Sequence, residues 1–502
     1  TATSWINPEM LQIPWDTMKK WLDKTPALAP YRFDIEDLYR QQAHVLDEEK
    51  EKLISYYTRF NGTPNLIYTD LSTADIDFPT ITLSTGDEIT ATSGNYSRVL
   101  ATNRNQEDRK KIFEAHYNTF KKNENTYASI YNAVCQRDWA NAQTRNYNST
   151  LEANLDNNNI PIAVYENLVN TVRANTAPLQ KYARLRAKIL GLKEYHQYDG
   201  SIPIIDFDET YPYNEAKDKV EASVAPLGED YQKRVERALA GGWIDVFENT
   251  GKRTGAYSSN VYGVHPYMLL NYNETMDYVF TLCHEIGHTI HTMLANENQP
   301  FATSGYTLFV AEVASTFNER LLLDNWLDKA EDPKERVALL LQAIKNITNT
   351  FYFQALLADF ELQVHRLAEE GKPITAKELN GIMKDLFTAY YGDSVVHDDL
   401  INTVWARISH FYTVPYYVYQ YATCFASSAK IYDDIKNKQG VEKQKAIDRY
   451  LNLLKSGGND YPMEQLKKAG VDLSTPEPYL AIINQFDKMV DQLGEEVEKL
   501  EK

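Results

Sequence analysis

Apolar residues recur three and four positions apart along most of the chain, a spacing typical of amphipathic α-helices. In the N-terminal part, this pattern covers residues 15–24, 36–60 and 108–134. From about residue 275 onward nearly every segment follows it, as far as the C-terminal "LGEEVEKLEK". The sequence therefore predicts a mainly α-helical protein.

Two short regions depart from this pattern and predict strands. Residues 78–97 alternate apolar and polar side chains around a Gly-Asp turn, which indicates a small β-hairpin. Residues 243–272 are also strand-like and lie directly before a histidine-rich helix. A boundary is expected at residues 198–214, which are rich in Pro, Asp and Gly. We predict a mostly helical lobe over residues 1–199 and a second domain over residues 200–502, with the small sheet and the C-terminal helices.

The helix predicted over residues 275–295 carries three of the ten histidines. Its apolar residues form one stripe, and His284, His288 and His291 fall on a second stripe. Residues four apart lie one above the other, about 6 Å apart along the helix axis. Imidazoles at positions 284 and 288 can therefore reach one metal ion about 2.0–2.1 Å from each nitrogen.

The segment His284-Glu285-Ile286-Gly287-His288 has the HExxH pattern of zinc hydrolases. In that pattern the two histidines bind the metal and the glutamate acts as general base. A chance match on an ordinary helix is the alternative, although the position directly after a β-segment favours the metal site. Gly287 costs about 1 kcal/mol relative to alanine in a helix. Close packing beside the metal would explain this glycine, and so would ordinary helix packing.

His291 does not fit the same ion. It lies about 10 Å along the axis from His284, too far for the two to share one metal. The extended motif of metzincins would require glycine at position 291 and histidine at 294, where the chain has His291 and Leu294. We expect His291 to lie behind the ligands or at the surface.

A catalytic zinc site takes a third protein ligand and leaves its fourth position to water. The next long helix, predicted over residues 304–327, offers Glu312 and Glu319 on one face. Residues 301–319 contain no Lys or Arg, whereas solvated helix faces usually mix both signs of charge. A carboxylate in such apolar surroundings is unfavourable unless a cation offsets it. Glu312 is the first candidate for the third ligand. Glu319 is the alternative ligand or a group that orients a ligand. The other explanation for both glutamates is that they lie on a solvated polar face.

Composition narrows the classes of function. The net charge of −18 argues against nucleic acid or anionic lipid as a partner. No apolar run approaches about 18 residues, so no membrane helix is expected, and the start of the chain has no secretory signal. Three distant cysteines form no disulfide framework and suit a reducing compartment, so we expect a cytoplasmic protein. No GxSxG, GxGxxG or P-loop motif supports another chemistry.

The chain resembles the oligoendopeptidase F subfamily of the thimet-oligopeptidase-like gluzincins over essentially its whole length. The segments that carry the resemblance occur in the subfamily's order: "KRTGAYSSNVYGVHPYMLLNY", "TLCHEIGHTIH", "FVAEVASTFNE", "ARISHFYTVPYYVYQYAT", "LKSGGNDYP" and "KKAGVDLSTPEP". Members are usually longer at the N-terminus, so the lobe over residues 1–199 is expected to be truncated relative to them. The resemblance implies a zincin-like catalytic core with a small sheet, inside a two-lobed helical shell around a deep central cleft.

The resemblance also implies roles for individual residues. His284, His288 and Glu312 match the ligands of one zinc ion per chain, and Glu285 matches the general base. The strand within residues 264–272 resembles the edge strand that pairs with an extended peptide.

A tyrosine-rich segment matches the part of the family that lies over the zinc. His410 and Tyr419 are expected to stabilise the oxyanion, because a neutral tyrosine can donate without changing charge near pH 7. Tyr412, Tyr416 and His265 are expected to contact the substrate, although packing roles are a strong alternative for each of them.

The sequence thus predicts a zinc-dependent endopeptidase that hydrolyses internal bonds of short oligopeptides. No nucleic acid or membrane partner is expected, and the oligomeric state is not indicated. A peptide-binding protein that kept the fold without the activity is the rival hypothesis, and the intact Glu285 argues against it.

Overall fold

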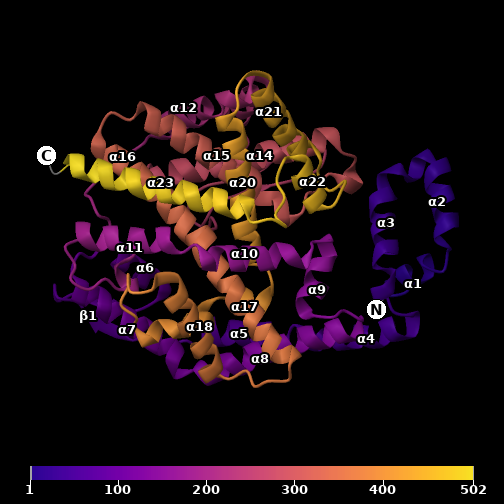
Figure 1. Cartoon of the computed structure of the whole chain (residues 1–502), viewed down its shortest axis with the longest axis horizontal. Coiled ribbons are helices and arrows are strands. Elements are labelled where there is room, and N and C mark those ends of the chain that lie inside the picture. Colours follow the sequence, from indigo (N-terminus) through magenta and orange to yellow (C-terminus); the bar gives the residue numbers. More distant parts are fainter. Residues whose placement is uncertain (1–2, 501–502) are drawn as a thin grey trace.

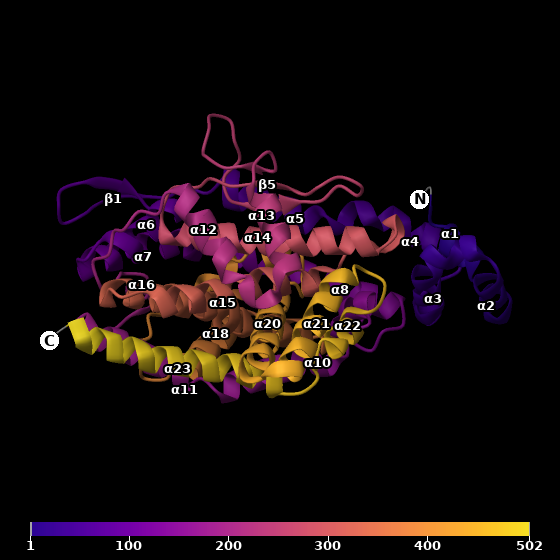
Figure 2. The same ribbon diagram turned by 90° about the horizontal axis from the view of Figure 1, so that it is seen from above.

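The helices of the chain, seen in a computed structural model that describes residues 3–500, form two groups joined by long helices (Figure 1). The mainly helical architecture confirms the prediction from the apolar pattern. In the first part of the chain the helices are α1 (Ile6–Met10), α2 (Trp15–Lys24), α3 (Arg32–Arg40), α4 (Glu48–Asn61), α5 (Thr63–Thr69), α6 (Ser93–Thr102), α7 (Gln106–Lys122), α8 (Glu124–Thr144), α9 (Thr150–Leu155), α10 (Ile162–Ala174) and α11 (Ala177–Ile189). Helices α1 to α3 stand at one end of the molecule in both views (Figures 1 and 2).

The predicted hairpin is present between α5 and α6. Strands β1 (Thr80–Thr82) and β2 (Glu88–Thr90) pair antiparallel, with Ile81 opposite Ile89. Ile89 is buried against the helical core, so the alternation of the sequence reports a strand with one covered face.

The middle of the chain forms the second, three-stranded sheet and the helices that follow it. These elements are α12 (Tyr213–Ser223), α13 (Glu229–Leu239), β3 (Ile244–Asp245), β4 (Tyr257–Ser259), β5 (Tyr267–Leu269), α14 (Met276–Asn298), α15 (Leu308–Lys329) and α16 (Pro333–Ile347). The strand order is β3-β5-β4, with β3 parallel and β4 antiparallel to β5.

This order corrects the expectation that the strand within residues 264–272 is an edge. That strand is β5. It is the central strand, because β3, which precedes the β4–β5 hairpin in the sequence, pairs with its other side. The free edge beside the histidine helix belongs to β4, whose Ser258 Oγ lies 3.0 Å from Thr289 Oγ1 of α14.

The last part of the chain crosses between the two groups of helices. It comprises α17 (Phe353–Glu369), α18 (Ala376–Tyr391), a 3₁₀ segment over Asp399–Arg407, α19 (His410–Thr413), α20 (Tyr419–Asn437), α21 (Gly440–Lys455), α22 (Pro462–Lys468) and α23 (Glu477–Leu500). Helix α17 packs on α8, α10 and α20, and α20 also packs on α15 and α23 (Figure 1).

Helices α14 and α15 touch through their backbones. A Cβ atom added at Gly287 would lie 2.6 Å from Ser315 Cα and 2.7 Å from the Ala314 carbonyl oxygen. The contact therefore requires glycine for the packing of α14 on α15, within the segment that carries His284 and His288. Cys283, Ile286 and Ile290 fill the rest of the interface side of α14 and are fully buried.

Helix α15 begins at Leu308, later than the pattern predicts. The preceding backbone is instead held by the loop between α21 and α22, where Gly458 N–H donates to the Thr303 carbonyl at 2.8 Å. Gly457 also has no room for a Cβ atom, which would lie 2.3 Å from the same carbonyl oxygen. This long-range contact leaves residues 304–307 outside the helix.

Gly287→Ala should lower the stability of the protein although alanine is the better helix former. Overpacking against α15 costs about 1–3 kcal/mol, more than the gain of up to about 1 kcal/mol in helix propensity. Thermal unfolding should show a lower midpoint. Gly381→Ala, on α18 with no atom within 4 Å of the added Cβ, is the matched control and should raise the midpoint or leave it unchanged. A midpoint for Gly287→Ala at or above wild type would contradict the packing argument.

Candidate active site

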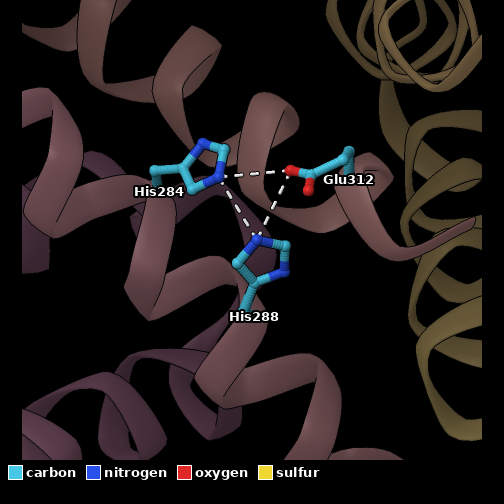
Figure 3. A group of neighbouring side chains, drawn as sticks. All are labelled: His284, His288 and Glu312. Atoms are coloured by element: carbon cyan, nitrogen blue, oxygen red, sulfur yellow. Dashed lines mark hydrogen bonds and ion pairs between the residues drawn. The ribbon is translucent and has the colours of Figure 1, made fainter. Parts of the chain in front are cut away.

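Three side chains from α14 and α15 converge on one point (Figure 3). His284 Nε2 lies 3.2 Å from His288 Nε2 and 3.2 Å from Glu312 Oε2, and His288 Nε2 lies 3.4 Å from the same oxygen. These three residues form the metal-ligand group found among residues 3–500, and each is partly buried. The structure thus brings together the three side chains that the sequence nominated as ligands.

The dimensions of this triangle fit a tetrahedral metal. Ligand atoms about 2.0–2.1 Å from a zinc ion are separated from one another by about 3.3–3.4 Å in tetrahedral geometry. The three measured edges match that spacing, and two imidazoles with one carboxylate are a donor set of catalytic zinc sites. The residues present therefore fit a zinc ion with one position left open.

Glu319 lies behind the ligands rather than among them. Its Oε1 accepts a hydrogen bond from His284 Nδ1 at 2.6 Å, and its Oε2 accepts one from Asn346 Nδ2 at 2.5 Å. A carboxylate on Nδ1 fixes the tautomer of His284, so that Nε2 presents its lone pair to the metal position. Ser315 Oγ donates to Glu312 Oε2 at 2.8 Å and fixes the third ligand.

Glu285 is adjacent to the triangle but is not part of it. The residue is 6 % exposed, and its Oε2 has no hydrogen-bond partner among residues 3–500. Burial raises the pKa of Glu285, and the charges of His284 and His288, with a smaller contribution from the backbone N–H of Ser258 on β4, partly oppose that shift. A buried carboxylate with a raised pKa and a free oxygen is suited to accepting a proton and returning it.

A second group of side chains comes from the segment around the start of α20. The hydroxyl of Tyr421 lies 3.4 Å from His410 Nε2, and Tyr417 stacks on the His410 ring at 5.6 Å between centroids. The negative charge of Glu312 helps to raise the pKa of both Tyr417 and Tyr421, although burial is the larger cause for each. Both tyrosines and His410 are partly exposed, and the two tyrosines are close enough to Glu312 to sense its charge.

Tyr419 points elsewhere. It is 2 % exposed, and its ring packs on Tyr165 at 4.9 Å and Phe309 at 6.1 Å, within the core. The reason is the helical period, because residues two apart in a helix point to nearly opposite sides. Within α20, Tyr421 therefore faces away from Tyr419, and it meets Tyr417, which lies just before the helix, at 5.3 Å between ring centroids.

The residues expected to contact substrate are engaged in packing. Tyr412 is fully buried and stacks on Tyr68 at 3.9 Å. His265 stacks on Trp243 at 4.4 Å and bonds the carbonyl of its neighbour Pro266 through Nδ1 at 2.9 Å.

Tyr416 is also buried, and its hydroxyl lies 2.8 Å from Thr150 Oγ1. None of these contacts involves the metal ligands.

His291 is buried rather than at the surface. Its ring stacks on Tyr306 at 3.6 Å, and burial lowers its pKa to about 3, so it is neutral at physiological pH. The residue packs α14 against the loop that leads into α15. His291 thus has a packing role. Its distance from His284 along the helix axis keeps the two residues from sharing one metal ion.

Family models match the chain over nearly all of its length. The model of "Peptidase family M3" covers residues 99–485, and the model of "Oligopeptidase F" covers residues 9–78. The chain belongs to peptidase family M3. It is therefore a peptidase, and because M3 is a family of metallopeptidases, its membership implies a bound metal.

Named relatives agree with this assignment. Oligopeptidase PepF of Bacillus subtilis is 38 % identical over 99 % of this chain and 73 % of its own length, and group B oligopeptidase PepB of Streptococcus agalactiae is 35 % identical over 99 % and 82 %. Among solved structures, a Chlamydophila abortus protein described as a peptidase superposes with a TM-score of 0.91 at 35 % identity, covering 98 % of this chain and 82 % of that one. Oligoendopeptidase F of Enterococcus faecium gives 0.82 at 30 %, covering 99 % and 84 %.

Three further observations concern the molecule outside the site. No helix within residues 3–500 is long and apolar enough to cross a membrane. A cavity of about 530 Å³ opens beside Thr275 and Asp277 at the N-terminal end of α14, between α16 and the segment that follows α11. A larger hollow of about 880 Å³, between α4, α5 and α8, contains none of the candidate residues.

Zinc analysis of single variants should separate the ligand from the orienting group. After loading and desalting, the wild-type protein should carry about one zinc per chain. Glu312→Ala should lose it, because one of three donor atoms is gone. Glu319→Ala should keep most of its zinc at saturating metal, with affinity lowered about 10- to 100-fold. The reverse result would refute the assignment of Glu312 as ligand and Glu319 as its support.

Proposed function

We propose that this member of family M3 is a zinc-dependent endopeptidase that hydrolyses internal bonds of short oligopeptides. The observation that carries the proposal is the triangle of two imidazoles and one carboxylate at tetrahedral spacing, with a buried free carboxylate beside it. The oligopeptidase names of its relatives support the substrate class. We expect the enzyme to act in the cytoplasm.

In this proposal His284, His288 and Glu312 hold the metal, and Glu285 handles the proton. Zinc held there would polarise the scissile carbonyl and lower the pKa of its water toward about 7. Glu285 takes a proton from the attacking water, which its raised pKa favours, and then delivers that proton to the leaving amine. Its Oε2 has no hydrogen-bond partner among residues 3–500 and is free to accept the proton.

We infer that Tyr421, supported by His410, donates to the oxyanion, in place of Tyr419. Support comes from the partial exposure of Tyr421, its contact with His410 and its sensitivity to the charge of Glu312. A tyrosine hydroxyl stays neutral and able to donate at physiological pH, because burial raises the pKa of Tyr421 above its ordinary value. Burial also lowers the pKa of His410, so this ring is neutral as well.

The peptide backbone is proposed to pair with the free edge of β4. This strand contacts α14 through Ser258, next to Glu285, so a peptide added there would bring a carbonyl to the general base. Backbone pairing reads no side chain, which suits an enzyme that accepts many short peptides. The rival hypothesis, a peptide-binding protein without activity, does not need the buried Glu285 carboxylate.

Glu285→Gln should separate metal binding from turnover. The amide keeps the size of the side chain but cannot accept the proton, so kcat on an internally quenched peptide should fall about 10²- to 10⁴-fold. Zinc content should equal that of wild type, because Glu285 is not a ligand. A variant that holds zinc and cleaves at the wild-type rate would exclude this mechanism.

Tyr421→Phe should slow the reaction, and Tyr419→Phe should not. Both remove one hydroxyl from the same helix, so the pair is matched for helix propensity and size. Loss of an oxyanion donor should lower kcat about 10²-fold with little change in KM. If Tyr419→Phe is the slower variant, the expectation from the sequence is right and the reassignment to Tyr421 is wrong.

A further inference from the structure

The segment that leads into α20 contains a residue in an unusual backbone conformation. Tyr416 has φ of +56°, in the left-handed region that a side chain with a Cβ adopts at a cost of about 1–2 kcal/mol. Such a residue persists only where the surroundings hold it, and strain of this kind gathers at functional sites. Tyr416 directly precedes Tyr417, and His410 lies at the other end of the same segment.

A buried carboxylate holds this turn. Glu361 of α17 is fully buried, and its Oε1 accepts a hydrogen bond from the backbone N–H of Tyr416 at 2.7 Å. The bond fixes the peptide plane that enters the left-handed residue. Its partner atom therefore lies on the main chain, and the contact depends on the shape of the turn and not on the tyrosine side chain.

Other contacts hold the Tyr416 side chain and the carbonyl side of the same peptide plane. The Tyr416 hydroxyl lies 2.8 Å from Thr150 Oγ1, and Asn154 Nδ2 donates to the Pro415 carbonyl at 3.3 Å. The rings of His365 and Tyr416 lie 4.5 Å apart. These contacts position the ring and the preceding carbonyl, whereas Glu361 alone among residues 3–500 bonds the Tyr416 amide.

A carboxyl group is a costly acceptor at this position. Glu361 Oε2 has no hydrogen-bond partner within the described part of the chain, and no Lys or Arg pairs with the carboxyl group there. Desolvation raises its pKa to about 7, with His365 partly opposing the shift. The Tyr416 N–H nevertheless needs an acceptor, because a buried donor left unsatisfied costs about 1–3 kcal/mol. Glu361 therefore serves one strained amide of the turn, and the turn sets where the residues after it lie.

We propose that Glu361 is a positioning residue that fixes the left-handed turn at Tyr416 and so presents His410, Tyr417 and Tyr421 to the metal site. The inference rests on the proposed function, since it assigns Glu361 to the group that stabilises the oxyanion. Glu361 itself touches neither the metal ligands nor the substrate position. Its effect is expected on kcat, because the geometry of the donor is needed most in the transition state.

Three substitutions at position 361 test the acceptor. Glu361→Leu removes it at similar volume, Glu361→Gln keeps an acceptor oxygen in the same place, and Glu361→Asp withdraws it by one methylene. For Glu361→Leu, kcat should fall about tenfold or more through misplacement of the donor, with KM and zinc content close to wild type. Its thermal midpoint should be lower, because the buried Tyr416 N–H loses its acceptor. Glu361→Gln should restore most of kcat, and Glu361→Asp should be slower than Glu361→Gln.

Asp359 provides a matched control on the same helix. It is also buried, but its carboxylate pairs with Arg173 and makes no contact with residues 410–421. Asp359→Leu should lower the thermal midpoint, because it removes the partner of Arg173, and should leave kcat unchanged. A loss of stability without a loss of rate at Asp359, against a loss of rate at Glu361 in a variant that still folds and binds zinc, supports positioning.

The outcomes are separable from those of the proposed function. If Glu361→Leu keeps the wild-type kcat, or if Glu361→Gln is as slow as Glu361→Leu, the inference is wrong. If Glu361→Leu does not fold, the comparison of Glu361→Asp with Glu361→Gln decides, and equal rates for the two overturn the inference. If instead Tyr421→Phe and His410→Ala turn over at the wild-type rate, the oxyanion assignment fails whatever Glu361 does.

Discussion

The backbone contact between α14 and α15 sets the geometry on which the rest of the site depends. The two histidines are placed by the period of one helix, but their distance to Glu312 is set by how closely a second helix approaches. At Gly287 that approach excludes even a methyl group. The three donor atoms then lie at 3.2–3.4 Å from one another, and a looser contact would leave Glu312 out of reach. Gly287 disfavours its own helix, but it is required for the short distances between the donor atoms of the site.

The same packing concentrates acidic groups that require a cation. Glu312, Glu319 and Glu285 all face the histidines, and residues 301–319 supply no Lys or Arg. The pKa of Glu312 is lowered by the hydrogen bonds from both histidines, in spite of its burial. A divalent ion between these groups would balance the charge without a basic side chain, which would occupy the open position. The lack of basic residues in this segment and the metal site therefore follow from the same requirement for a bound cation.

Local period and motif spacing predicted the parts of the site that a single helix determines. His284, His288 and Glu285 follow from the helical repeat, and Glu312 from its position in an apolar segment without basic residues. The sequence favours Tyr419, which the structure turns into the core, because the sequence alone does not show which face of α20 is covered, and residues two apart on a helix face nearly opposite sides. The edge strand was misassigned because the pairing of β3 with β5 is non-local, and no turn signal near β5 reports it.

Glu361 could not be identified from the sequence, for a related reason. On α17 it is one acidic residue within an amphipathic repeat, and nothing in its neighbours distinguishes it from Asp359. Glu361 matters because it bonds the backbone N–H of Tyr416, which lies much later in the chain and has a strained conformation only in the folded protein. The metal ligands rest on the contact between α14 and α15, whereas the oxyanion group rests on a turn held from α17. Helix α17 also packs directly on α20. The turn at Tyr416 is therefore held from α17 in two ways, by the Glu361 carboxylate and by the packing of the two helices, and both fix where the tyrosines lie relative to α17.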